Sequence, residues 1–170
     1  MSVSQLPQPR LVRTETDLST GLSVFSADSQ LVPSMPFGPT AAGFTVLDAR
    51  GYVPVSNIVP SLHHDSPLPR CPPNGSIFAV TDVPGGGHSA PMHRTVTIDY
   101  AVVLSGEIVL QLDNGEEKTL HAGDTLVQGG ANHAWVNRAD APCRMLFVML
   151  AAEKIVTKDG TVLEEAGLKR

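Results

Sequence analysis

The chain has 170 residues, a formal charge of −5 and a pI near 5.6. A chain of this length is expected to form one domain, and its acidic charge argues against nucleic acid or a membrane surface as the main partner. No apolar run is long enough to span a membrane, and the first residues lack the apolar core of a signal peptide. The two cysteines, Cys71 and Cys143, are expected to be reduced thiols in a cytoplasmic protein.

Residues 1–75 are predicted to form an N-terminal arm, a few strands and a Pro-rich loop that pack on the rest of the domain. The predicted strands are 11–16, 22–28 and 44–49. Residues 53–75 contain six prolines, a density that excludes both a helix and a central strand. We therefore expect a long ordered loop or a lid there.

Residues 76–151 are predicted to be the core of an all-β fold. The predicted strands are 76–83, 95–104, 107–112, 116–120, 124–128, 133–137 and 143–151, and residues 84–91 are a flexible connection. Strands that recur every eight to twelve residues with turn signals between them are typical of an antiparallel barrel or sandwich. The tail, residues 152–170, contains a turn at 158–160 that a short helix could follow, and it has no predicted place on the core.

Polar side chains share one face of the segment 93–103. Alternation along a strand places its odd residues on one side, beginning with His93, Thr95, Thr97 and Asp99. The same parity places His133 and Trp135 together on the strand 133–137. Two imidazoles and one carboxylate can form a facial metal site if these strands are neighbours inside a barrel.

Two motifs in this region resemble those of the cupin superfamily of small β-barrels. The first is PGGGHSAPMHRTVTIDYAVVLSGE, with His93 at the first histidine, Asp99 at the glutamate and Gly106 at the final glycine. The second is AGDTLVQGGANHAWVN, with Gly130, His133 and Asn137 at its characteristic positions. The resemblance implies a jelly-roll-like antiparallel barrel, and HRT, IDY and NHAW are similar to a fungal subgroup found beside biosynthetic enzymes for secondary metabolites.

The chain also departs from the cupin pattern. Thr95 stands where the second histidine is usual, Asp99 is one methylene shorter than glutamate, and Gln128 replaces a proline. The resemblance thus implies a divalent metal (Zn, Fe or Mn) held by His93, Asp99 and His133, or a metal-free site in which these residues act as acid–base groups. In the second case Asp99 could orient one of the imidazoles.

Four further residues are predicted to bind substrate: Thr95, Thr97, Trp135 and Arg144. Trp135 could equally be a core residue, and Arg144 at a strand end could pair with a carboxylate or reach solvent. The other histidines, 63, 64, 88 and 121, are expected on surface loops, and Arg94 has the parity of an outer or dimer-facing residue. Cys143 is expected in the core, without a disulfide to Cys71.

The predicted function is a small-molecule enzyme with a metal-assisted or histidine-based, non-oxidative mechanism. Decarboxylation, dehydration, isomerisation or cyclisation of a secondary-metabolite-like substrate would suit such a lyase or isomerase. One alternative is a non-haem Fe(II) oxygenase or dioxygenase, and another is a non-catalytic binding protein. The resemblance also implies a homodimer formed through the N-terminal strands.

Overall fold

The computed structural model describes residues 6–58, 60–62 and 66–167. These residues form strands, turns and loops, and they contain no helix. Within them, then, no helix could cross a membrane. The short helix predicted for the tail is therefore wrong for residues 152–167, which form a hairpin-like loop closed by a bridge between Val156 and Val162.

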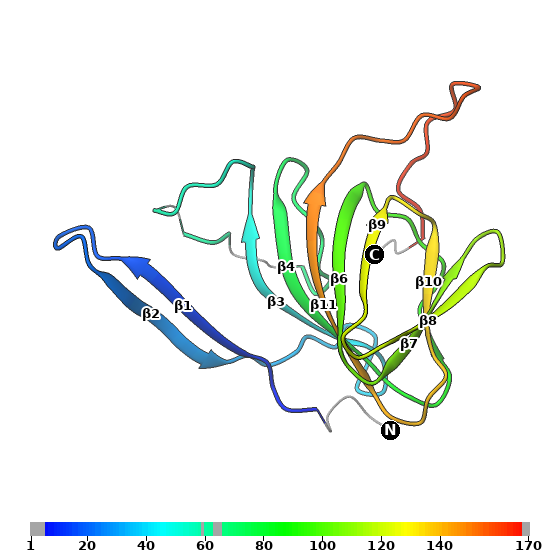
Figure 1. The fold of residues 1–170 in the computed structure, drawn as a ribbon, viewed down its shortest axis with the longest axis horizontal. Helices are drawn as coiled ribbons and strands as arrows, with labels where there is room; N and C mark the ends of the chain where they lie inside the picture. The colour runs from blue at the N-terminus through cyan, green and yellow to red at the C-terminus, as the bar shows by residue number, and fades with distance from the viewer. Residues whose placement is uncertain (1–5, 59, 63–65, 168–170) are drawn as a thin grey trace.

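Two antiparallel sheets form the barrel (Figure 1). The larger sheet has the order β3 (Gly43–Arg50), β4 (Ser76–Val83), β11 (Cys143–Ala151), β6 (Thr97–Ser105), β9 (Thr125–Gly129). The smaller has the order β5 (His88–Ser89), β10 (His133–Asn137), β7 (Glu107–Leu112), β8 (Glu117–His121). All strand pairings within these two sheets are antiparallel, which confirms the predicted fold class.

The strands form where apolar residues alternate with polar or exposed ones. In β6 the odd residues from Thr97 to Val103 are buried, while Tyr100 and Leu104 on the other face are exposed. Gly106 then turns the chain into β7 with a φ of 76°, and a Cβ at this position would lie 2.8 Å from the carbonyl oxygen of Pro142. Only glycine fits this turn without moving the backbone.

The segment 93–103 is not one continuous strand. His93 pairs with His133 through two backbone hydrogen bonds of 2.8 and 2.9 Å, on the edge of β10. After a bend at Val96, the chain continues as β6 in the other sheet, between β11 and β9. The chain thus changes sheets between His93 and Asp99, and the two residues reach the barrel interior from different walls.

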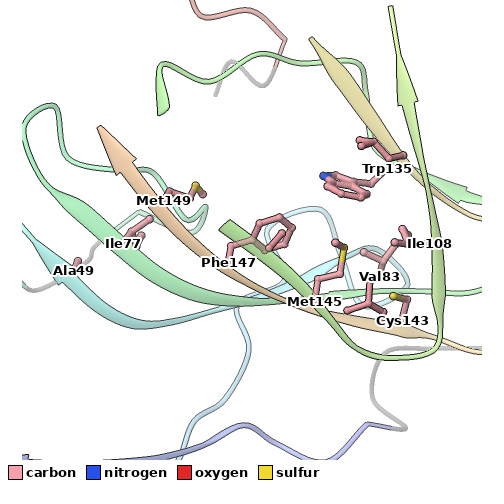
Figure 2. Close-up of a cluster of buried hydrophobic side chains, with 12 residues drawn as sticks. Ala49, Ile77, Val83, Ile108, Trp135, Cys143, Met145, Phe147 and Met149 are labelled. Atoms are coloured by element: carbon pink, nitrogen blue, oxygen red, sulfur yellow. The ribbon is translucent and has the colours of Figure 1, made fainter. Parts of the chain in front are cut away.

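The apolar core lies between the two sheets (Figure 2). Trp135 on β10 meets Phe147 on β11 edge to face, with 6.0 Å between the ring centroids. Met145 and Met149 flank Phe147 on the same face of β11, and Cys143 is fully buried at the start of that strand. Cys143 therefore lies in the core, as predicted, and both cysteines are free thiols.

The N-terminal hairpin lies outside the barrel. Strands β1 (Arg10–Thr16) and β2 (Ser23–Gln30) pair only with each other and extend to one side of the molecule (Figure 1). The Pro-rich loop after β3 carries no strand among its described residues. β3 itself pairs along β4 and so belongs to the barrel sheet, although it precedes the predicted core of 76–151.

Candidate functional site

A cavity of about 650 Å³ occupies the barrel interior and its mouth. Most of its deep wall is apolar, formed by Ala79, Val83, Trp135, Met145, Phe147 and Met149. Polar atoms come from His93, Asp99 and His133, which all line this one cavity. The structure therefore places the three candidate site residues, which alternation along the strands had predicted to share a site, around one cavity.

The two imidazoles lie side by side and carry their protons on the same nitrogen. Their ring centroids are 4.2 Å apart. His93 Nδ1 is 2.9 Å from the carbonyl oxygen of Pro91, and His133 Nδ1 is 2.9 Å from that of Ala131. A carbonyl can only accept, so each Nδ1 must be the protonated nitrogen and each neutral ring presents a bare Nε2.

Asp99 is connected to His133 through Gln128. The Nε2 of Gln128 is 3.3 Å from Asp99 Oδ2 and 3.2 Å from His133 Nε2. Asp99, Gln128 and His133 are all buried, with 2–5% of their surfaces exposed. The backbone carbonyls, and not Asp99, fix the histidine tautomers, so the predicted role of Asp99 as orienter of an imidazole is wrong for this arrangement.

Burial shifts the protonation of all three residues in the cavity. It lowers the pKa of His133 to about 4, an effect to which the adjacent His93 adds. Burial likewise lowers the pKa of His93 from its ordinary value of 6.5. It raises the pKa of Asp99, although the neighbouring Thr97 hydroxyl and the Gln128 amide favour the carboxylate. Both imidazoles are therefore neutral at pH 7 and able to accept a proton.

The residues present do not fit the predicted three-ligand metal centre. Among the residues that the structure describes, no group of three His, Cys, Asp or Glu side chains is close enough together to hold a metal ion. Two of the atoms that would coordinate it, His133 Nε2 and Asp99 Oδ2, instead face the amide nitrogen of Gln128. A cation would have to displace this amide before His133 and Asp99 could bind it.

The predicted substrate-binding residues divide into two groups. Thr95, Thr97 and Trp135 line the cavity, and the hydroxyl of Thr97 donates a 2.8 Å hydrogen bond to that of Thr95. Arg144 does not line it, so this assignment is wrong. Its guanidinium forms two hydrogen bonds of 2.6 and 2.7 Å with Asp82, which is 2% exposed.

The mouth of the cavity contains residues that were not expected there. His88 and Arg94 line the cavity, although both were predicted to face outward. The C-terminal segment returns to this mouth, where Arg94 and Ala166 form a backbone bridge and Glu165 pairs with Arg70 at 2.9 Å. His121 is exposed as predicted, while His63 and His64 lie outside the described residues.

Gly167, which follows Ala166 in the C-terminal segment, lies very close to His93. A Cβ on Gly167 would lie 2.6 Å from the Cβ of His93, and the φ of Gly167 is 93°. Sequence reasoning missed these contacts because they depend on where the tail packs. A signal for Gln128 did exist, since alternation along 124–128 places it on the same face as Leu126.

Comparisons with known proteins find similarity to cupin domains. The model of the cupin domain matches residues 79–149. The chain is 51% identical over 92 residues to a phomopsin biosynthesis cluster protein of Diaporthe leptostromiformis, an alignment that covers 54% of this chain and 48% of the relative. It is 36% identical over 94 residues to a cupin-domain-containing oxidoreductase of Neurospora crassa, with 54% and 47% covered. The chain thus spans about half the length of these curated relatives.

A solved structure is also similar. It is a sugar phosphate isomerase from a cupin superfamily, from Silicibacter pomeroyi, with 26% identity and a TM-score of 0.40 over 45% of this chain and 51% of that chain. Residues 79–149 match the cupin-domain model, and this segment carries both motifs with their histidines on an antiparallel barrel, so this part of the chain is similar to cupin domains.

Proposed function

We propose that this protein is a small-molecule enzyme that moves a proton within a secondary-metabolite-like substrate, as a lyase or isomerase does. The observation that carries the proposal is the pair of neutral imidazoles beside a buried carboxyl in one largely apolar cavity. Relatives belong to the phomopsin and oryzines biosynthesis clusters, which supports the substrate class.

His93 is the proposed general base. Its Nε2 has no hydrogen-bond partner among the described residues, and its Nδ1–H is held by Pro91, so the free lone pair has a fixed direction. Asp99 is the second proton acceptor, because its raised pKa makes it a better base than an exposed carboxylate. A proton that His93 takes from one substrate atom can return to another atom in an isomerisation or cyclisation, or pass to the departing hydroxyl group in a dehydration, which then leaves as water. In a decarboxylation the proton taken from the carboxyl group passes to the carbon from which CO₂ leaves.

Solvent exchange provides a test that does not require the natural substrate. The protein would be incubated in D₂O with a panel of small enolisable ketones, hydroxy ketones and β-keto acids, and deuterium incorporation followed by NMR. His93→Gln should reduce catalysed exchange by about 10²–10⁴-fold, the usual contribution of a general base. His121→Gln, which changes an exposed imidazole at the barrel surface, is the matched control and should leave the rate unchanged.

Two alternatives predict different results. Relatives from Neurospora crassa and Hypocrea virens are called cupin-domain-containing oxidoreductases, which favours an oxidative enzyme as the second candidate. Turnover that requires oxygen would support that candidate and overturn ours, whereas turnover without oxygen that stops after chelation of divalent metal would indicate the metal-assisted form of the proposed reaction. Ligand binding without exchange, unchanged by His93→Gln, would indicate a non-catalytic binding protein.

The homodimer implied by the family resemblance is part of the proposal. The hairpin of β1 and β2 carries apolar side chains that are 40–78% exposed in this single chain, among them Leu22, Val24 and Phe25. A second copy that covered this hairpin would remove them from water.

A further inference from the structure

Gln128 lies behind the cavity wall, between two residues that form it. It is the cross-strand partner of Asp99 in the β6–β9 pairing, and it precedes His133 by five residues. Gln128 is 5% exposed, whereas Thr125, Val127 and Gly129 of β9 are exposed to solvent. Burial of a side-chain amide is unfavourable unless its polar atoms form hydrogen bonds. The partners of the Gln128 amide nitrogen are Asp99 and His133.

The hydrogen-bond chemistry fixes the orientation of this amide. His133 Nε2 is a bare acceptor because Nδ1 donates to Ala131, and a carboxylate oxygen of Asp99 is an acceptor too. The group between them must therefore be the NH₂ of Gln128, with one hydrogen for each partner. The opposite orientation would place the amide oxygen against two other acceptors.

With the NH₂ group of Gln128 turned toward Asp99 and His133, this part of the cavity wall presents hydrogen-bond acceptors and no side-chain amide donor. Asp99 Oδ1 is buried and has no hydrogen-bond partner in the described part of the chain. His93 Nε2 is a second acceptor on the same cavity. A buried acceptor without a partner destabilises the site until a ligand or water supplies a donor.

We propose that Gln128 is a positioning residue whose NH₂ group holds Asp99 Oδ2 and His133 Nε2, so that Asp99 Oδ1 and His93 Nε2 remain as acceptors and the cavity selects a substrate with a hydroxyl or enol donor. The inference deepens the proposed function, on which it rests for the entry of a small molecule into the cavity. The substrate class is an apolar molecule whose buried end carries at least one hydroxyl group.

A matched pair of probes tests the selection. 4-Fluorophenol and 4-fluoroanisole differ by replacing the donor hydrogen with a methyl group, and ¹⁹F NMR measures the affinity of each for the wild-type protein. We expect the phenol to bind at least about tenfold more tightly, as one hydrogen bond to a charged acceptor allows. Equal affinities would overturn the inference.

Gln128→Glu tests the role of the amide itself. A carboxylate next to Asp99 cannot ionise fully beside it, so one of the two keeps a proton and becomes a donor. The preference for 4-fluorophenol should fall to about threefold or less, and the control Gln30→Glu, at an exposed position of β2, should retain it. An unchanged preference in Gln128→Glu would refute the positioning role.

A spectroscopic measurement on the wild-type protein decides the case even if Gln128→Glu does not fold. Imidazole ¹⁵N shifts should show His133 of the wild-type protein as the Nδ1–H tautomer with an unprotonated Nε2. An Nε2–H tautomer in the wild type would overturn the proposal. Because neither readout needs turnover, an inactive protein that still prefers the phenol would contradict the proposed enzyme and leave this inference standing.

Discussion

Replacement of Arg144 by leucine should destabilise the protein without affecting its ligand site. Arg144 and Asp82 face each other across β11 and β4, their side chains are 12% and 2% exposed, and two hydrogen bonds join them. Arg144→Leu leaves a buried carboxylate without its partner, a change that typically costs about 3–5 kcal/mol. For a domain of this size that corresponds to a fall in Tm of roughly 6–20 °C.

Urea unfolding followed by fluorescence provides the assay, since the chain has one tryptophan and it lies in the core. Arg10→Leu is the matched control, because Arg10 forms the same two-bond geometry with Asp28 on the exposed hairpin and should have a far smaller effect. Adding Asp82→Asn to Arg144→Leu should restore more than half of the loss by removing the stranded charge. A loss below about 1 kcal/mol in Arg144→Leu, or weaker binding of 4-fluorophenol, would refute this account and support a ligand-binding arginine.

Two further predictions concern acidity and assembly. The pKa of His133 is about 4 in the folded protein and near 6.5 when unfolded, so the unfolded state binds more protons between these values, and stability should fall by about 3 kcal/mol from pH 6.5 to pH 4. Asp99, with its raised pKa, opposes this loss of stability near its own pKa. His133→Asn should flatten the dependence of stability on pH, and an equally steep dependence in the variant would contradict the lowered pKa of His133. Phe25→Ser, at a side chain 78% exposed on the hairpin, should shift the protein from dimer to monomer in light scattering, whereas a wild-type monomer would refute the dimer.

Most of the strands could be predicted because their side chains alternate. In β6 and β11 every second residue is apolar or functional and buried, and turns with glycine lie between the strands. The same alternation placed His93 and Asp99 toward one cavity. It could not reveal that the chain changes sheets at Val96, because a change of hydrogen-bonding partner leaves the period of two intact.

The failures have a common physical origin. The partner of Arg144, the return of the tail to Arg94, and the position of His88 all depend on which distant segments meet in space. A general rule predicts that a buried arginine needs a carboxylate or an anionic ligand as its partner. Only the register between β4 and β11 shows that the partner of Arg144 is Asp82.

Two of the three departures from the cupin pattern, Thr95 and Gln128, explain each other in electrostatic terms. His133 Nε2 and Asp99 Oδ2 point their lone pairs toward the same small volume, and converging acceptors need a positive partner between them. A metal ion is one such partner, and it requires enough ligands, a number that Thr95 in place of an imidazole reduces. The N–H groups of Gln128 are another, and they supply the positive charge as hydrogen-bond donors from a side chain that cannot leave. A threonine at position 95 and a glutamine at position 128 therefore suit one another, because the first removes a ligand and the second removes the need for the cation.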